Sequence, residues 1–268
     1  TAQKRAAIGA APVEGDTLDL FSQEQESETE RTLEIITDKA KAKELAAHLE
    51  DLVTKDGFEF YVLADGSSQQ EYMPVGVAFG TTDGKTSYVP IDNDVLLAQG
   101  LTLGTFKEIF GRVLEHKKPI KCGYDTKYMK HVFANVGINL AGVSDDVMLE
   151  SYVLEAHRSH TIEKLAANWL KYELRGEEEL LGKGAKKLSF SQVSVEKAAE
   201  FASERVFIVS RLNRLFKKAL SDDAKLEKIY RDIEMPLSDV LFKMEQNGVL
   251  IDTKLLDQQT AQLNTKAR

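Results

Sequence analysis

Three strand-type segments follow one another early in the chain, and they limit the possible folds more than any other feature. Aromatic and β-branched residues concentrate in residues 58–63, 75–79 and 86–91. Turn residues end the first segment at 65–68, and an Asp-Gly pair at 83–84 separates the second segment from the third. Because short turns join neighbouring antiparallel strands, this pattern predicts a three-stranded antiparallel meander.

Helical periods fill most of the remaining sequence. Residues 195–220 are the longest example, with an apolar stripe at the spacing of one helix face. Further helices are expected at 39–53, 105–115, 127–136, 145–154 and 161–172, and short strands at 33–36 and 120–123. Strands concentrated early and helices concentrated late predict an α/β fold, with a central mixed sheet and helices packed on it.

The first residues differ in composition from the rest. Residues 1–31 include seven acidic residues between Glu14 and Glu30, and that stretch has no lysine or arginine. A segment so poor in apolar residues does not offset its ordering entropy by burial. We therefore expect an acidic flexible linker.

The last residues return to helical periods. Residues 226–247 are expected to form a helix that is bent or restarted at Pro236, and residues 249–252 an extended piece before a final helix. Because that helix is still running at Arg268, we expect the chain to be a piece of a larger protein.

Composition excludes several classes of protein. The net charge of −8 argues against a protein that coats nucleic acid by bulk charge, and no apolar run approaches the roughly 20 residues that span a bilayer. The first 18 residues lack the apolar core of a signal peptide. The single cysteine, Cys122, excludes an internal disulfide and a cysteine-based zinc site, and we expect it to be buried and inert. These features favour a cytoplasmic protein without membrane contact.

Four motifs resemble one family in their order and spacing. Residues 146–154 and 182–190 resemble the 3′→5′ proofreading exonuclease domain of bacterial DNA polymerase I, family A. Residues 233–237 and 244–252 resemble the beginning of its polymerase domain. The resemblance extends over residues 32–268.

The resemblance implies a ribonuclease H-like exonuclease fold and three regions. These are the linker at 1–31, a degenerate exonuclease-like domain at 32–220 and the truncated, helical beginning of a polymerase domain at 221–268. The parent protein would be a nucleotidyltransferase, a DNA-directed DNA polymerase that uses Mg²⁺ in DNA replication and repair. Its polymerising residues would lie beyond Arg268, so we expect no polymerase activity from this fragment itself.

Proofreading in this family requires carboxylates that hold two divalent metals about 3.5–4 Å apart at the scissile phosphate. The resemblance implies an Asp-x-Glu pair on the first strand, one Asp in the second motif, and one Asp four residues after a Tyr on a late helix. In this chain the four ligand positions hold Tyr61, Leu63, Met129 and Arg205, and Phe201 replaces the tyrosine. Because all four carboxylates are missing, we expect no catalytic residue, metal or other cofactor here, and a structural role for an inactive proofreading domain.

Four other acids lie near these motifs: Glu59, Asp65, Asp125 and Asp146. They leave open a relocated metal site and a metal-dependent 3′→5′ exonuclease, with Glu59 and Asp146 as its first candidates. Turns and helix starts are ordinary positions for capping acids, so we favour structural roles for Asp65 and Asp125.

A further interpretation is a module that binds single-stranded DNA without cutting it. The resemblance places Lys183, Lys186 and Lys187 near the path of the single strand, and Lys127 of the second motif is another candidate contact. The negative net charge argues against strong binding, and we favour lysines that only solvate the surface. The expected partners are DNA, through the parent polymerase, and the remaining polymerase domain in cis, and the resemblance implies a monomer.

Overall fold

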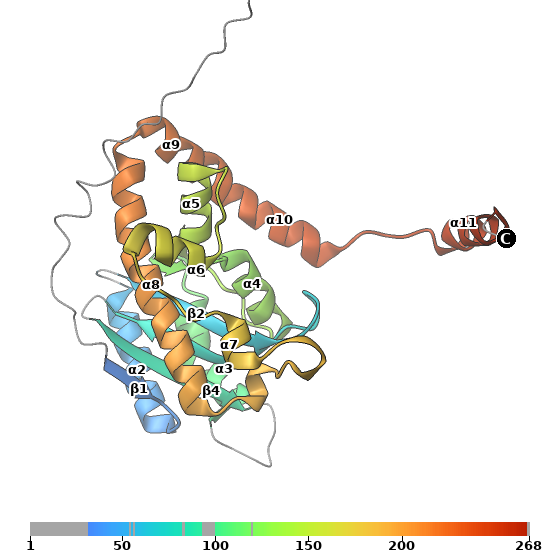
Figure 1. The fold of residues 1–268 in the computed structure, drawn as a ribbon. Coiled ribbons are helices and arrows are strands. Elements are labelled where there is room, and N and C mark those ends of the chain that lie inside the picture. Colours follow the sequence, from blue (N-terminus) through green and yellow to red (C-terminus); the bar gives the residue numbers. More distant parts are fainter. Residues whose placement is uncertain are drawn as a thin grey trace, which may run out of the picture. The chain divides into compact units, whose positions relative to one another are not determined.

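The computed structural model describes residues 32–53, 55, 57–81, 84–92, 100–118 and 120–266, and Figure 1 shows their fold. The linker expected at 1–31 and the aspartate of the turn at 83–84 lie outside the described residues. Within them, one sheet has the strand order β1-β4-β3-β2-β6-β7, and β5 pairs with β4. The strands are β1 (Thr32–Ile35), β2 (Phe58–Asp65), β3 (Met73–Gly80), β4 (Lys85–Asp92), β5 (Leu101–Thr102), β6 (Lys121–Gly123) and β7 (Val143–Asp146).

The central strands form the predicted meander. β2 pairs with β3 and β3 with β4 in antiparallel fashion, so Tyr61, Ala78 and Tyr88 lie side by side across the sheet. β1 runs parallel to β4, while β6 and β7 continue the sheet beyond β2 in parallel. The predicted α/β fold with a central mixed sheet is confirmed.

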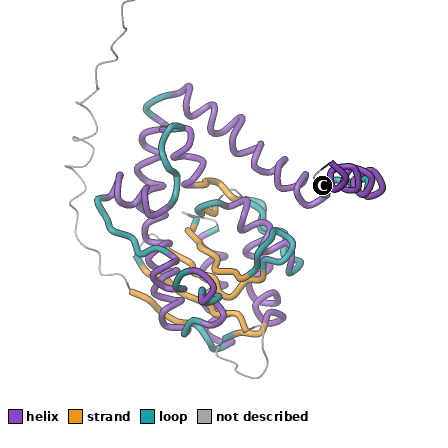
Figure 2. Tube along the Cα trace, turned by 45° about the vertical axis from the view of Figure 1, so that its right-hand side comes forward, coloured by secondary structure: helices purple, strands orange, loops and turns teal. Residues whose placement is uncertain are grey.

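Helices cover both faces of this sheet (Figure 1, Figure 2). They are α2 (Lys39–Leu52), α3 (Leu103–Leu114), α4 (Thr126–Asn135), α5 (Val147–Glu155), α6 (Ile162–Leu165), α7 (Glu177–Leu181), α8 (Val195–Ser221), α9 (Ala224–Ile229), α10 (Met235–Asn247) and α11 (Thr253–Lys266). In the described part of the chain, no helix is long and apolar enough to cross a membrane.

Each face of the sheet has its own hydrophobic core. On one face, Phe79 of β3 stacks on Phe110 of α3, with ring centroids 5.4 Å apart. On the other face, α8 approaches β3 so closely that a Cβ on Gly80 would stand 2.2 Å from Cγ1 of Val206. Glycine at this position therefore allows the longest helix to lie directly on the sheet, where it borders the site described below.

Most expected elements are confirmed to within two residues, and the helix expected at 145–154 is among them, but its first two residues belong to a strand. It begins at Val147, because Asp145 belongs to β7 and pairs with Cys122 of β6. The side chain of Asp146 then accepts hydrogen bonds from the first turn of α5. The acids that look like the start of a helix therefore end a strand.

The helix expected at 161–172 is also wrong in part. It is α-helical only over Ile162–Leu165, and a π-helical turn follows at Ala166–Leu170. Lys171 ends the helix with a φ of 54°, in the left-handed region. Trp169, within the π-helical turn, packs edge-on against Phe216 of α8, with ring centroids 5.0 Å apart.

The stretch expected to bend near Pro236 consists of two helices. α9 ends at Ile229, a π-helical turn covers Tyr230–Glu234, and α10 begins with Pro236 in its first turn. The restart expected at Pro236 is therefore confirmed, while the domain boundary expected after residue 220 stays a prediction. Three short elements, β5, β7 and α7, are absent from the sequence prediction.

Candidate functional site

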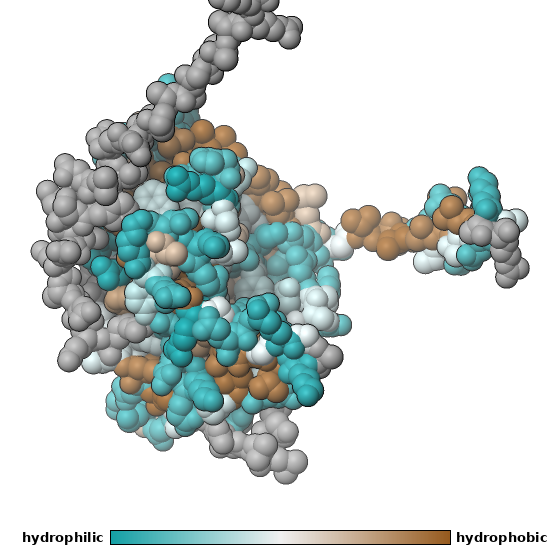
Figure 3. Space-filling model, in the orientation of Figure 1, coloured by the Kyte–Doolittle hydropathy of each residue, from teal (hydrophilic) through white to brown (hydrophobic). Residues whose placement is uncertain are grey.

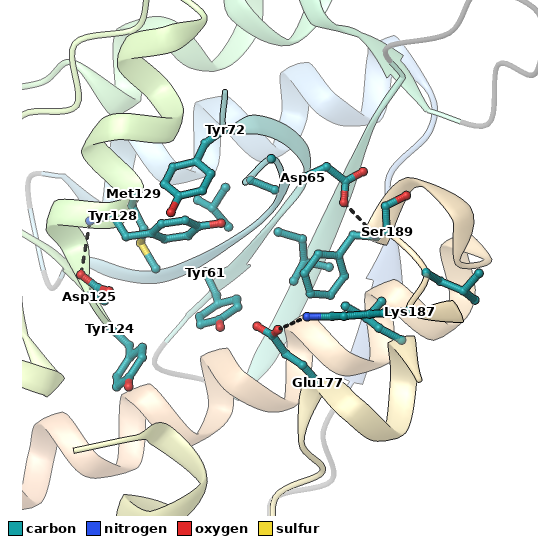
Figure 4. A pocket seen from close by; sticks show the side chains of 17 residues that line it. Tyr61, Asp65, Tyr72, Tyr124, Asp125, Tyr128, Met129, Glu177, Lys187 and Ser189 are labelled. Carbon is teal, nitrogen blue, oxygen red and sulfur yellow. Dashed lines mark hydrogen bonds and ion pairs between the residues drawn. The ribbon is translucent and has the colours of Figure 1, made fainter. Parts of the chain in front are cut away.

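The side chains at the positions identified by the family resemblance lie together. Tyr61 and Leu63 belong to β2, and they line a cavity of about 530 Å³ together with Met129 of α4. Tyr61 also lines a neighbouring cavity of about 540 Å³ with Arg205 of α8, and Phe201 lies beneath the Arg205 guanidinium. We refer to the two cavities, which share Tyr61, as the Tyr61 cleft; Figure 4 shows the first of them.

Arg205 is the most deeply buried charge of this cleft, at 1% exposure. Its guanidinium carbon lies 3.3 Å from the ring centroid of Phe201 and 6.0 Å from that of Tyr61. Nη2 donates to the backbone oxygen of Arg175 at 2.8 Å and to Oε1 of Glu163 at 3.1 Å. Aromatic faces and one carboxylate thus hold a permanent positive charge at this position.

The other positions are neutral. Leu63 and Met129 are each 1% exposed and belong to the hydrophobic cores. Burial raises the pKa of Tyr61 to about 12, so its hydroxyl keeps its proton at neutral pH. Mg²⁺ takes oxygen ligands, above all carboxylates. Two apolar side chains, a neutral phenol and a guanidinium do not fit a pair of Mg²⁺ ions.

Two of the displaced acids border the cleft and have backbone partners. Asp65 accepts hydrogen bonds from the backbone N–H groups of Phe190 at 2.6 Å and Ser191 at 3.1 Å. Asp125 is the N-cap of α4 and accepts from the N–H of Tyr128 at 3.3 Å. Asp125 therefore has the capping role expected from the sequence. Asp65 is structural as expected, but it binds the distant backbone of residues 190–191 rather than its own turn.

The carboxylate of Asp146 is engaged in hydrogen bonds within the protein. Its carboxylate accepts from the backbone N–H of Asp125, Thr126, Met148 and Leu149, and from the Thr126 hydroxyl, at distances of 2.7–3.4 Å. A carboxylate with five donors joins the start of α4 to the start of α5. This geometry is that of a structural cap.

Glu59 belongs to a different cavity, of about 550 Å³, which it shares with Cys122 and Asp145. Asp145 lies 2.7 Å from Nζ of Lys217 and 2.9 Å from Nη1 of Arg231. Burial raises the pKa of Glu59, and it raises that of the buried Cys122 thiol well above its usual value. Among the described residues, no three His, Cys, Asp or Glu side chains are placed to hold a metal ion.

The candidate DNA-contacting lysines are mostly engaged with carboxylates. Lys127 lies 2.5 Å from Glu245, Lys183 lies 2.6 Å from Glu178, and Lys187 lies 3.7 Å from Glu177. Lys186 is exposed on a short turn between α7 and Phe190. The structure therefore places three of the four in ion pairs rather than in one basic surface.

Several side chains of the cleft are absent from the sequence analysis. Tyr72, Tyr124, Tyr128 and Glu177 all line the first cavity. Tyr124 and Tyr128 belong to the second motif, close to Met129. Two tyrosines within this one motif are a feature of the sequence that could have indicated them as site residues. Tyr72 and Glu177 come from a loop and a short helix far away in the chain, and no local pattern connects them.

Comparison with known proteins agrees with this geometry. The sequence profile described as "DNA polymerase I, ribonuclease H-like domain" matches residues 69–212. DNA polymerase I of Pseudomonas aeruginosa is 35% identical over 201 residues, which cover 74% of this chain and 22% of that protein. DNA polymerase I of Borreliella burgdorferi is 25% identical over 250 residues, which cover 90% of this chain and 26% of that protein.

Solved structures show the same fold. The POL domain of Pol1 from M. smegmatis, in complex with DNA primer-template and dNTP, superposes with a TM-score of 0.66 at 22% identity, over 88% of this chain and 35% of that one. Trypanosoma brucei RNase D superposes with a TM-score of 0.56 at 12% identity, over 69% of this chain and 64% of that one. This chain spans about a quarter of the length of the two curated relatives. Its profile match and its identity to the Pseudomonas protein show that it belongs to the DNA polymerase I family and contains the ribonuclease H-like domain of that family.

Proposed function

We propose that the chain is part of a DNA polymerase I whose exonuclease-like domain has lost the proofreading reaction and keeps a structural role. One observation carries this proposal: Tyr61, Leu63, Met129 and Arg205 stand where the family resemblance implies carboxylates. Arg205 matters most, because a buried guanidinium repels the divalent cations on which that reaction depends.

A structural role requires contacts between the sheet and the following part of the chain. α4 provides them toward α10, since Glu245 lies 2.5 Å from Lys127 and 2.7 Å from Nε2 of His131. Gln246 lies 2.9 Å from the other ring nitrogen of His131, and Phe242 packs edge-on against the ring with centroids 4.8 Å apart. These contacts support a fixed orientation of α10 on the exonuclease-like domain.

The segment after α9 also exposes apolar side chains (Figure 3). Those with the largest exposed fractions along it are Met244, Val249, Leu250, Ile251 and Leu263, all above 60%. Exposed apolar surface of this kind marks a contact with another protein surface. The remaining polymerase domain in cis is the proposed occupant, and residues 221–268 are the proposed beginning of that domain.

The activity of the whole protein belongs to the proposal as well, because the chain spans only about a quarter of its relatives. That activity is template-directed nucleotide addition with Mg²⁺, by a monomer in the cytoplasm that binds DNA through its polymerase domain. The M. smegmatis structure, solved with primer-template and dNTP, supports this assignment by its fold.

The geometry supports the two alternatives less well. A relocated exonuclease would need Glu59 and Asp146, but Glu59 lines another cavity and Asp146 is occupied by five donors. A single-stranded DNA-binding module would need lysines without carboxylate partners, whereas Lys183 and Lys187 are exposed but paired with glutamates.

The test is a nuclease assay on the purified chain. A 3′-labelled single-stranded oligonucleotide is incubated with Mg²⁺ or Mn²⁺, with and without a chelator, and release of the terminal nucleotide is followed. A proofreading DNA polymerase I treated in parallel shows that the substrate can be cleaved. The proposal expects no metal-dependent release from a chain whose fold is verified by circular dichroism. Release that the chelator stops, and that co-purifies with the chain, would overturn it.

A further inference from the structure

The first cavity of the Tyr61 cleft has features that a purely structural domain does not use. Four tyrosines line it: Tyr61, Tyr72, Tyr124 and Tyr128 (Figure 4). The rings of Tyr72 and Tyr128 meet edge to face with centroids 4.9 Å apart, and the hydroxyl of Tyr124 donates to the backbone oxygen of His160 at 2.9 Å. The cavity therefore has a wall of oriented aromatic rings.

Carboxylates add negative charge to this wall. Asp65, Asp125 and Glu177 line the cavity, while Lys187 is the single basic residue in its lining. The negative charge of these carboxylates affects the tyrosine hydroxyls. Burial raises the pKa of Tyr128, and the charges of Glu177 and Asp125 raise it further. Burial raises the pKa of Tyr61, Tyr124 and Tyr128, so these three hydroxyls keep their protons at neutral pH. Their neutral rings keep electron-rich faces beside the carboxylates.

A cavity of this kind disfavours phosphate and favours a cation. Anionic ligands meet three carboxylates against one ammonium, whereas ammonium and guanidinium groups are attracted both by carboxylates and by the faces of tyrosine rings. The cleft already contains one such arrangement, because Arg205 stacks on Phe201 and pairs with Glu163. The open cavity offers the same groups, carboxylates beside aromatic rings. Arg205 lies 6.0 Å from the Tyr61 centroid and Lys187 pairs with Glu177, but among the described residues no cationic side chain stacks on Tyr72, Tyr124 or Tyr128.

We propose that this cavity binds an organic cation through an ammonium or guanidinium group placed against the tyrosine rings. A polyamine and a basic side chain of a partner peptide carry the same chemistry, and the test distinguishes them. The proposal goes beyond the structural role and does not depend on it, since cation binding without metal and nuclease activity with metal are separate measurements.

The experiment is isothermal titration calorimetry on the full chain at low ionic strength, without divalent metal. The probes are spermidine and an acetylated, amidated Gly-Arg-Gly peptide, with a thymidine tetranucleotide as the anionic comparison. We expect a single site for at least one cationic probe, weakened several-fold by physiological salt, and no binding of the tetranucleotide. Spermidine alone binding identifies a polyamine site, and tighter binding of the peptide identifies a site for a basic protein segment.

Substitutions assign the binding to the cavity. Tyr128→Leu removes the ring and Glu177→Gln removes one charge, and each is expected to weaken binding at least fivefold. Tyr128→Phe keeps the ring and should stay within about twofold of the unchanged chain. Glu44→Gln on α2, an exposed acid outside the cavity lining, is the control for the overall negative charge. Glu177 is about half exposed, so its substitution tests the proposal even where Tyr128→Leu does not fold.

Three outcomes would overturn the proposal. The first is absence of binding by both cationic probes at millimolar concentration. The second is unchanged affinity in the folded Glu177→Gln and Tyr128→Leu variants, or an equal loss in Glu44→Gln. The third is preferential binding of the tetranucleotide, which would indicate that the cleft accepts nucleic acid.

Discussion

The guanidinium of Arg205 lies 3.3 Å from the centre of the Phe201 ring, one turn earlier on the same helix. Both residues stand at positions where the family resemblance implies parts of a metal-dependent nuclease site. The pair also closes the floor of the cleft, because Arg205 reaches across to Glu163 and to the backbone of Arg175. One helix therefore supplies both the cation and the ring that holds it.

Removing Arg205 should destabilise the domain. We expect Arg205→Ala to lower the free energy of unfolding by about 3 kcal/mol, because the change leaves a cavity, one unpaired carboxylate and one unpaired carbonyl. Urea unfolding measures this difference. The matched control is Arg158→Ala, an exposed arginine paired with Glu155, which should cost less than about 0.5 kcal/mol. Equal effects of the two substitutions would show that the stacked guanidinium contributes no special stability.

Restoring carboxylates should restore metal binding. The variant with Tyr61→Asp, Leu63→Glu, Met129→Asp and Arg205→Asp is expected to bind Mn²⁺, because it brings four carboxylates to one cleft. Calorimetry with Mn²⁺ measures the binding, and circular dichroism verifies the fold. The control keeps Arg205 and changes only the other three, and repulsion by the guanidinium should weaken its binding. A folded four-site variant that gives no heat of binding would mean that these positions are not the ligand positions of the family.

Replacing Asp146 should be costly even though it is not proposed to be catalytic. Asp146→Ala removes the acceptor for five hydrogen-bond donors at the starts of α4 and α5, so we expect a loss of about 3 kcal/mol of stability. Asp38→Ala, at the exposed N-cap of α2, removes the acceptor for two donors and should cost about 1 kcal/mol. Thermal and urea unfolding compare the two variants. A smaller loss for Asp146→Ala than for Asp38→Ala would argue against the structural role.

Glu150 should make the domain less stable as pH rises. It is fully buried, and neither carboxyl oxygen has a hydrogen-bond partner among the described residues. Burial, together with the charge of Asp145, raises its pKa well above the usual value. The folded state therefore keeps a proton that the unfolded chain releases above pH 4.5, and the free energy of unfolding falls as pH rises beyond that point.

Glu150→Gln should remove this dependence. The variant is expected to gain stability relative to the unchanged chain as pH rises from 5 to 8, by at most about 1.4 kcal/mol per pH unit. Urea unfolding at several pH values measures the gain. Glu173→Gln, which changes an exposed glutamate, serves as the control and should show no such trend. A constant difference between Glu150→Gln and the unchanged chain at all pH values would contradict the shifted pKa.

The elements that the sequence predicts well are those whose signal is local. The meander over residues 58–91 follows from alternation and tight turns, and α8 follows from a long apolar stripe. Asp145 was misplaced because an acid before an apolar run looks like a helix start, whereas its pairing with Cys122 depends on a strand more than 20 residues earlier. The π-helical turn that contains Trp169 packs against Phe216 of α8, a contact that no local pattern in the sequence shows.

The cleft could be located from the sequence only in part. The resemblance identified Tyr61, Leu63, Met129 and Arg205, and the structure places these side chains around the cleft. Glu177 could not be found in this way, because it lies on a five-residue helix that looks like an acidic loop in the sequence. The partners of Lys127 and His131 on α10 are more than 110 residues away, so only the folded chain shows them.

The buried position of Arg205 has a consequence for how the domain responds to its surroundings. Ions bound by carboxylates exchange with solution, so the charge of such a site varies with the supply of free metal and with competing chelators. A guanidinium is attached to the backbone and keeps its proton throughout the physiological pH range. The positive charge of this cleft therefore belongs to a side chain and not to a bound metal ion. It stays constant when the cellular magnesium concentration changes.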